Sequence, residues 1–229
     1  MEKRFELTEN YVVNEFGTKL YQIKCIKTFK YAKKGELGGF IEKEENLSQK
    51  GNAWVYDNAQ VYDNARVYDD ALVYARVCGN ARVYGNARVY GNALVCGNAR
   101  VYGDVRVYDN ARVYGYALVY GYAQVYGAAH VYNDAMVCDD ALVSGNARVY
   151  GSAHVYGNAR VSNNALVSGN ALVSGNAQVY GAAHVYNDAM VYGNAQVYGI
   201  VWVYGNAHVY GNARVCDDAR VYGDTKVCK

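Results

Sequence analysis

The chain has 229 residues, a formal charge of +2 and no proline, with 24 glycines and 26 tyrosines but only 4 phenylalanines. The small net charge argues against binding to nucleic acid or to an anionic membrane through charge alone. Because no run of about 18 apolar residues exists, no transmembrane helix is expected.

The first ten residues, MEKRFELTEN, lack the apolar segment of a signal peptide. We therefore expect a cytoplasmic protein. Six cysteines in a chain of this length, without a secretion signal, predict free thiols and not a disulfide framework.

Residues 1–40 predict a small β-rich cap. Tyr21, Ile23 and Cys25 alternate as in a strand, and residues 14–17 carry the polar and glycine residues of a turn before it. Such a cap is physically needed, because the first coil of a repeat protein otherwise exposes an unpaired strand edge.

Residues 41–229 predict a hexapeptide repeat. From Val55 to Val227, 30 valines recur every six residues, with one step of four residues between Val73 and Val77. An alanine stands two residues before the valine in 27 of these 30 units. Two apolar positions that lie two residues apart predict a short strand with one buried face.

The other positions of the unit complete the coil. The residues between alanine and valine, and just after valine, should point outward, and the Gly-Asn pair that follows should turn the chain at a corner. Three units then form a triangular coil of about 18 residues. The four-residue step is expected to pinch the prism and to rotate the faces before it relative to those after it.

An internal duplication supports this coil length. The segment VYGAAHVYNDAMV begins at residue 125 and again at residue 179, an offset of 54 residues, or three coils of 18. A duplication of whole coils keeps each residue on its original face. About ten coils, at a rung spacing of ~4.8 Å, predict a rod close to 50 Å long.

The repeat resembles the hexapeptide repeat of left-handed β-helix proteins, which implies an all-β, left-handed parallel β-helix. The entry segment LGGFIEKEENLSQKGNAWVYDNA at 37–59 and the strand KLYQIKCIKTF at 19–29 look like those of the YdcK-like β-solenoid proteins. These proteins are common in phage and prophage genomes. The family is often labelled as a transferase by analogy with hexapeptide acyltransferases.

Outward aromatic and arginine side chains form the candidate partner surface. Tyrosine follows the valine in 21 of the 30 units, and arginine precedes it in 11. The alternative is structural: stacked tyrosines hold neighbouring rungs together, and arginine stems cover their rings as a solvated face. Serines at 144, 162, 168 and 174 interrupt the tyrosines. The candidate residues are Trp54, Trp202, Tyr84, Tyr90, Tyr102, Tyr108, Tyr198, Tyr204, Arg82, Arg88, Arg100 and Arg106.

Both tryptophans are expected to face outward. Trp202 lies near Ile200, which replaces a corner asparagine, so this is the most apolar exposed spot that the sequence predicts. Cys78 and Cys96 are 18 residues apart and should be neighbours on one face. No Cys or His grouping predicts a metal site, and no cofactor is expected.

The four histidines, His130, His154, His184 and His208, occupy the outward position before valine. In trimeric hexapeptide acyltransferases a histidine at a subunit interface acts as general base. The alternative is that these histidines were copied with the duplicated coils, since no inserted loop interrupts the repeat.

Three functional hypotheses follow. The first is a non-catalytic scaffold that binds an unknown protein partner or another copy of itself, in a virus–host setting, without membrane or nucleic acid. The second is a trimeric acyltransferase with a small-molecule acyl donor and one histidine as base. The third is a solenoid that assembles end to end.

Overall fold

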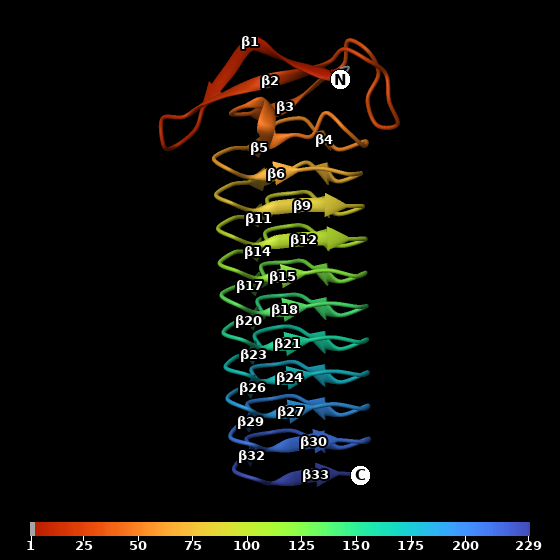
Figure 1. Ribbon diagram of the computed structural model, residues 1–229. Coiled ribbons are helices and arrows are strands. Elements are labelled where there is room, and N and C mark those ends of the chain that lie inside the picture. Colours follow the sequence, from red (N-terminus) through yellow and green to blue (C-terminus); the bar gives the residue numbers. More distant parts are fainter. Residues whose placement is uncertain (1–2) are drawn as a thin grey trace.

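The hexapeptide units stack as three parallel sheets and form a straight rod (Figure 1). Each coil contributes one short strand to each sheet. This computed structural model describes residues 3–229. The fold is an all-β solenoid of about ten turns with a small antiparallel sheet at its N-terminal end. The expected parallel solenoid and its coil length are confirmed.

We number the three faces by their sheets. Face I holds β1 (Phe5–Val13), β2 (Lys19–Cys25), β3 (Leu37–Ile41), β5 (Gln60–Val61), β8 (Arg76–Val77), β11 (Leu94–Val95), β14 (Arg112–Val113), β17 (His130–Val131), β20 (Arg148–Val149), β23 (Leu166–Val167), β26 (His184–Val185), β29 (Trp202–Val203) and β32 (Arg220–Val221). Face II holds β4 (Trp54–Val55), β7 (Leu72–Val73), β10 (Arg88–Val89), β13 (Arg106–Val107), β16 (Gln124–Val125), β19 (Leu142–Val143), β22 (Arg160–Val161), β25 (Gln178–Val179), β28 (Gln196–Val197) and β31 (Arg214–Val215).

Face III holds β6 (Arg66–Val67), β9 (Arg82–Gly85), β12 (Arg100–Gly103), β15 (Leu118–Val119), β18 (Met136–Val137), β21 (His154–Val155), β24 (Leu172–Val173), β27 (Met190–Val191), β30 (His208–Tyr210) and β33 (Lys226–Cys228). One short 3-10 helix, η1 (Glu44–Asn46), lies between the cap and the first full coil.

The core is a column of alanine and valine. On face II, Val89 lies in register with Val107, and both side chains are fully buried. The Tyr90 amide donates to the Val107 carbonyl at 3.0 Å, and bonds of this kind recur along the rod. Each buried valine contributes roughly 1.5–3 kcal/mol. The predicted inward positions are therefore confirmed.

The corners have the backbone that their residues predict. Gly97 takes φ of 66° at the first corner position, and Asp139 takes 57° at the same position of another coil. The Asp139 carboxylate accepts a hydrogen bond from the amide of Gly157 on the next coil, at 3.1 Å. Asparagines at the second corner position form ladders, in which the Asn176 amide donates to Asn194 at 3.0 Å.

The four-residue step does not rotate the faces, so that expectation is wrong. Leu72 on β7 pairs with Arg88, and Val61 pairs with Val77, so strands on both sides of the step stay in the same sheets. The local offset is 16 residues instead of 18, because one corner lacks its two turn residues. Rung-to-rung hydrogen bonding keeps valine above valine, and the corner absorbs the deletion.

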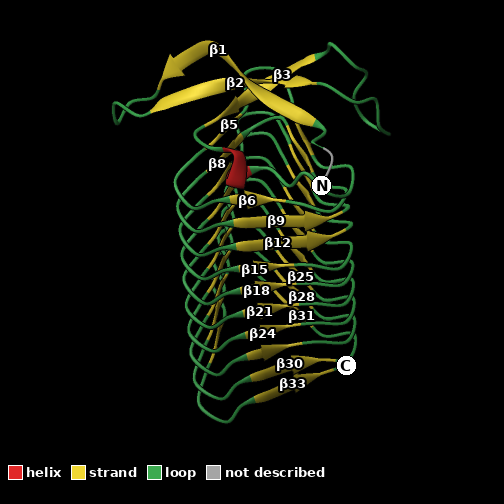
Figure 2. Cartoon of the chain, turned by 45° about the horizontal axis from the view of Figure 1, so that its top comes forward, coloured by secondary structure: helices red, strands yellow, loops and turns green. Residues whose placement is uncertain are grey.

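The N-terminal cap lies across the top of the rod (Figure 2). Strands β1 and β2 are antiparallel, and the turn between them has the Asn14 side chain accepting from the Phe16 and Thr18 amides. Strand β3 pairs antiparallel with β2 and parallel with β5. Cap and solenoid therefore share one continuous sheet, and residue 40 lies within β3.

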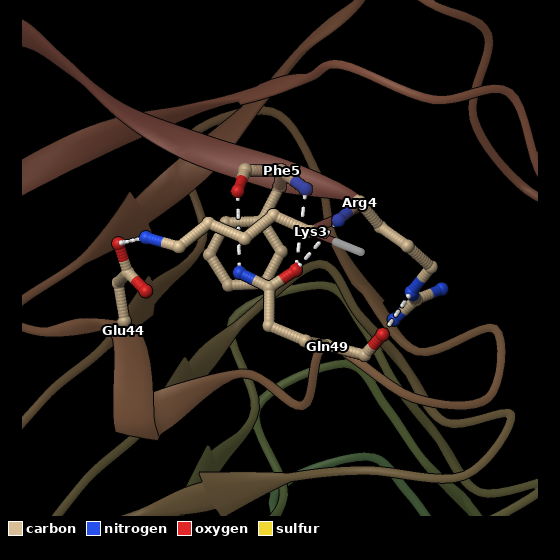
Figure 3. A network of polar contacts seen from close by, with 5 residues as sticks. All are labelled: Lys3, Arg4, Phe5, Glu44 and Gln49. Carbon is tan, nitrogen blue, oxygen red and sulfur yellow. Dashed lines mark hydrogen bonds and ion pairs between the residues drawn. The ribbon is translucent and has the colours of Figure 1, made fainter. Parts of the chain in front are cut away.

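Polar contacts fasten β1 to the segment after η1 (Figure 3). The Gln49 side chain accepts from the Arg4 and Phe5 amides and donates to the Phe5 carbonyl. The Arg4 guanidinium donates to the carbonyls of Ser48 and Gln49 at 2.6 and 2.8 Å. Because Arg4 is mostly buried, these carbonyls replace the water that its charge loses.

Trp54 does not face solvent, and that expectation is wrong. Its side chain is fully buried, with the Phe5 ring at 6.4 Å and the Phe29 ring at 5.5 Å between centroids, both edge-to-face. The cap folds over face II at this coil and covers an outward position. Trp54 is therefore an anchor for the cap and no part of an exposed surface.

Candidate interaction surfaces

Tyrosine rings form stacked ladders on all three faces. On face III, Tyr68, Tyr84, Tyr102 and Tyr120 stack with centroids 4.7, 4.8 and 5.1 Å apart and planes within 6°. On face II, Tyr90 and Tyr108 are 5.0 Å apart with planes at 2°. The in-register strands impose this spacing, because each ring follows a valine on its own rung.

This stacking decides what the tyrosines can offer a partner. Each ring inside a ladder has both π-faces against neighbouring rings, so only its edge and hydroxyl remain free. Burial raises the pKa of Tyr108, with the neighbouring Tyr126 and Tyr90 as further causes. The ladders therefore stabilise the rod, and a planar ligand can stack on them only where a ring is missing.

Arginines form two exposed columns near the cap. Arg66, Arg82 and Arg100 lie in register on consecutive rungs of face III, and Arg88 and Arg106 do the same on face II. None of these five makes an ion pair within residues 3–229. Like charges one rung apart repel, so an anionic group would relieve this repulsion.

Grooves border both columns. One of about 610 Å³ lies beside η1 and is lined by Glu44, Glu45, Arg66, Arg82 and Tyr68, among others. A second, of about 590 Å³, is lined by residues that include Leu72, Tyr74, Tyr90, Arg88 and Arg106. Arg66 was absent from the predicted surface set. Its place above Arg82 follows from the 16-residue offset, which the sequence shows only once the corner deletion is recognised.

The predicted apolar spot near Trp202 is exposed. Ile200 is 59% exposed at the corner between faces II and I, and Trp202 is 38% exposed on β29. The His184 ring stacks on Trp202 at 5.2 Å, and the Arg220 guanidinium lies 5.8 Å from its centroid. We call Ile200, Trp202 and Tyr204 the Ile200–Trp202 patch.

Ring stacking extends from this patch along face I and continues beside it on face II. Tyr204 stacks on Tyr186 at 5.0 Å on face I. Tyr198 stacks on Tyr180 at 5.0 Å on face II, across the corner from Trp202. A hydrogen bond with the Cys216 thiol raises the pKa of Tyr198. Trp202 and Tyr204 therefore lie on face I, and Tyr198 lies on face II across the corner that holds Ile200.

The four histidines lie on two faces. His130 and His184 are on face I, and His154 and His208 are on face III. His130 pairs in register with Arg112 and Arg148, whereas His154 lies between Met136 and Leu172. Burial lowers the pKa of His130, and the two flanking guanidiniums lower it further.

Cys78 and Cys96 are neighbours on face I, as expected, since β8 and β11 pair in register. A hydrogen bond from the Cys96 thiol is the largest influence on Cys78 and lowers its pKa to about 7, against a desolvation cost. The Tyr62 hydroxyl also donates to Cys78. The same Cys78–Cys96 contact raises the pKa of Cys96.

Across residues 3–229, no three His, Cys, Asp or Glu side chains converge as a metal site would require. The paired corner aspartates act in turns, as Asp139 shows with its bond to Gly157. No helix within the described part of the chain is long and apolar enough to cross a membrane.

A protein-family model matches the repeats of this rod. The model of the YdcK β-solenoid repeat matches more than half of the chain, at residues 59–74, 75–91, 81–97, 87–103, 105–121, 141–157, 153–168, 165–181, 183–199 and 213–228. The chain belongs to the YdcK β-solenoid repeat family. No curated protein matches its sequence.

Solved structures that match include the UDP-N-acetylglucosamine acyltransferase of Francisella novicida. The similarity has a TM-score of 0.37 and 13% sequence identity, and it covers 72% of this chain and 68% of that one. At this level the similarity carries no argument about an activity of this YdcK-family chain.

Proposed function

We propose that this protein is a non-catalytic interaction scaffold that binds a protein partner, or a second copy of itself, on a rigid rod. The observation that carries this proposal is the Ile200–Trp202 patch. Tryptophan, tyrosine and arginine are the residue types that dominate binding energy at protein interfaces. The patch contains Trp202 and Tyr204, and the Arg220 guanidinium lies over the indole ring.

The rod around the patch supports the same function. Hydrogen bonds join successive rungs, and the tyrosine ladders hold them in register, so the patch is presented without a large ordering cost. The resemblance of residues 37–59 to those of phage-encoded proteins supports a virus–host setting for this role. A cytoplasmic location, where the thiols stay reduced, is part of the proposal.

The test compares the wild-type chain with the double variant Ile200→Asn and Trp202→Gln. Asparagine and glutamine already occupy these two positions in other coils, so the variant should fold. The matched control is Met190→Gln on face III, a side chain that is 36% exposed. Light scattering with and without reducing agent gives the solution mass, and chemical cross-linking in extracts gives bound proteins.

We expect the patch variant to lose self-association or partner cross-linking about tenfold or more, while the Met190 variant keeps it. Equal masses and equal cross-linking for all three proteins would overturn the proposal. A discrete trimer unaffected by the patch variant would do so as well, and would favour an acyltransferase with His130, His154, His184 or His208 as base.

A further inference from the structure

The tyrosine ladder of face II has a gap of two rungs. Tyr90, Tyr108 and Tyr126 form an unbroken stack, with centroids 5.0 and 4.8 Å apart. The next two rungs carry Ser144 and Ser162 at the ladder position, and the ladder resumes at Tyr180. The strands below remain in register throughout, so the backbone continues where the rings stop.

The gap is bounded by two free aromatic faces. Tyr126 has one ring face against Tyr108, and Tyr180 has one against Tyr198 at 5.0 Å, so each turns its other face toward the gap. The two rings are three rungs apart, or about 14 Å at the usual strand spacing. Two planar rings, one per missing rung, would continue the ladder at its own spacing.

Polar side chains and one leucine line the gap. A groove of about 320 Å³ lies here, lined by Ser144, Ser162, Arg160, Gln178 and Leu142 together with the two bounding tyrosines. Ser144 is nearly buried, and Ser144 and Ser162 both line the groove. The exposed Arg160 lies on the same rung as Ser162 and makes no ion pair among the residues that the structure describes.

We propose that this gap is a binding site for two stacked nucleobases joined by a phosphodiester. The free faces of Tyr126 and Tyr180 would stack on the two bases. The serine hydroxyls would hydrogen-bond polar base edges, and Arg160 would meet the phosphate charge. The site takes two bases because two rungs are missing.

Other parts of the rod do not offer this site. Face I also lacks rings on two successive rungs, at Cys78 and Cys96, but Tyr62 at one end of that gap is only 4% exposed and so offers no free ring face. A single ring is missing at Ser168 on face I and at Cys138 and Ser174 on face III, so each of these gaps has room for one planar group. Within the ladders the π-faces are occupied by neighbouring tyrosines. The proposal therefore concerns one short segment of face II, separate from the Ile200–Trp202 patch and independent of it.

Calorimetric titration of the full chain tests the site with three probes. These are the dinucleotide adenylyl-adenosine, the mononucleotide AMP and an eight-nucleotide single strand of deoxyadenosine. The blocking variant is Ser144→Tyr with Ser162→Tyr, which restores the residue found in 21 of 30 units and so should fold. The matched control is Ser174→Tyr, which fills a gap on face III and leaves face II unchanged.

We expect one dinucleotide per chain, AMP at least tenfold weaker, and no binding to the blocking variant. The Ser174 control should bind like wild type, and Arg160→Gln should weaken binding about tenfold and reduce its salt dependence. If the single strand binds far more tightly than the dinucleotide, a strand is the source of the bases, whereas equal affinity identifies a free dinucleotide. No saturable binding of the dinucleotide or of the single strand, or equal binding by the blocking variant, would overturn the proposal.

Discussion

The indole of Trp54 on the first strand of face II lies against the ring of Phe29 in the cap, with centroids 5.5 Å apart and planes at 69°. This contact couples a residue of the repeat to a residue of the cap. The Arg4 guanidinium covers the same Phe29 ring at 4.4 Å. The top of the rod is therefore closed by a packed aromatic cluster and not by backbone pairing alone.

Replacing Trp54 with alanine should loosen the cap. Loss of a fully buried tryptophan costs about 3–5 kcal/mol in a packed core. In a repeat rod this loss acts mainly on the neighbouring elements. We expect faster amide exchange in β1 to β3 and a lower denaturation midpoint. Trp202→Ala is the control, and an equal effect of both changes would contradict the role given to Trp54.

Alanine at Gly97 should destabilise the rod by about 1–2 kcal/mol, because a non-glycine residue is strained at positive φ. A Cβ there would also lie 3.0 Å from the Gly115 amide nitrogen on the next coil. Gly97→Asn should cost less, since asparagine occupies the same corner position at Asn133 with φ of 59°. Urea denaturation measures both, and equal losses would argue against the backbone explanation.

The reactivity of Cys78 should rise with pH around neutrality. Its pKa is held at about 7, below the ordinary value of 9.0, chiefly by the hydrogen bond from the Cys96 thiol. Alkylation by iodoacetamide, followed by peptide mass spectrometry, should show a midpoint near pH 7 for Cys78. Removing the donor with Cys96→Ala should move this midpoint up, toward the ordinary value.

The control is the Cys96→Ser variant, because the serine hydroxyl at position 96 can still donate a hydrogen bond to the Cys78 thiolate. A midpoint that stays the same in both variants would show that Cys96 does not set the Cys78 pKa. Protection of the thiolate by Tyr62 would then be tested with Tyr62→Phe, since that hydroxyl is the second donor.

His130 should remain neutral to a lower pH than an ordinary histidine. Burial and the guanidiniums of Arg112 and Arg148 depress its folded pKa below 6.5. A group with a depressed folded pKa contributes stability that is present above its unfolded pKa of 6.5. That contribution is lost as the pH falls through the folded value.

An NMR titration of the imidazole checks this expectation. Arg148→Gln should raise the His130 pKa, because one repelling charge is removed. Arg160→Gln on face II should leave it unchanged, since that residue lies on another sheet. A His130 pKa at or above 6.5 in the wild type would contradict the electrostatic explanation.

The six-residue pattern by itself determined the parallel solenoid, the coil of three units and the inward place of Ala87 and Val89. These features follow from local periodicity: two small apolar residues face inward on each strand, and Gly, Asn or Asp supplies positive φ at the corner. The duplication at 125 and 179 added the coil length. No long-range information was needed for any of these features.

Only the tertiary structure decided how rungs and cap meet. The cap buries Trp54, although its position in the repeat is outward, because Phe5 and Phe29 reach it from far along the chain. The faces stay aligned across the shortened corner, because hydrogen bonds between rungs pair Val61 with Val77 although the offset there is 16 residues instead of 18. Whether a ring is free or stacked, as for Tyr126, depends on the residues one coil away on either side, which only the folded register brings together.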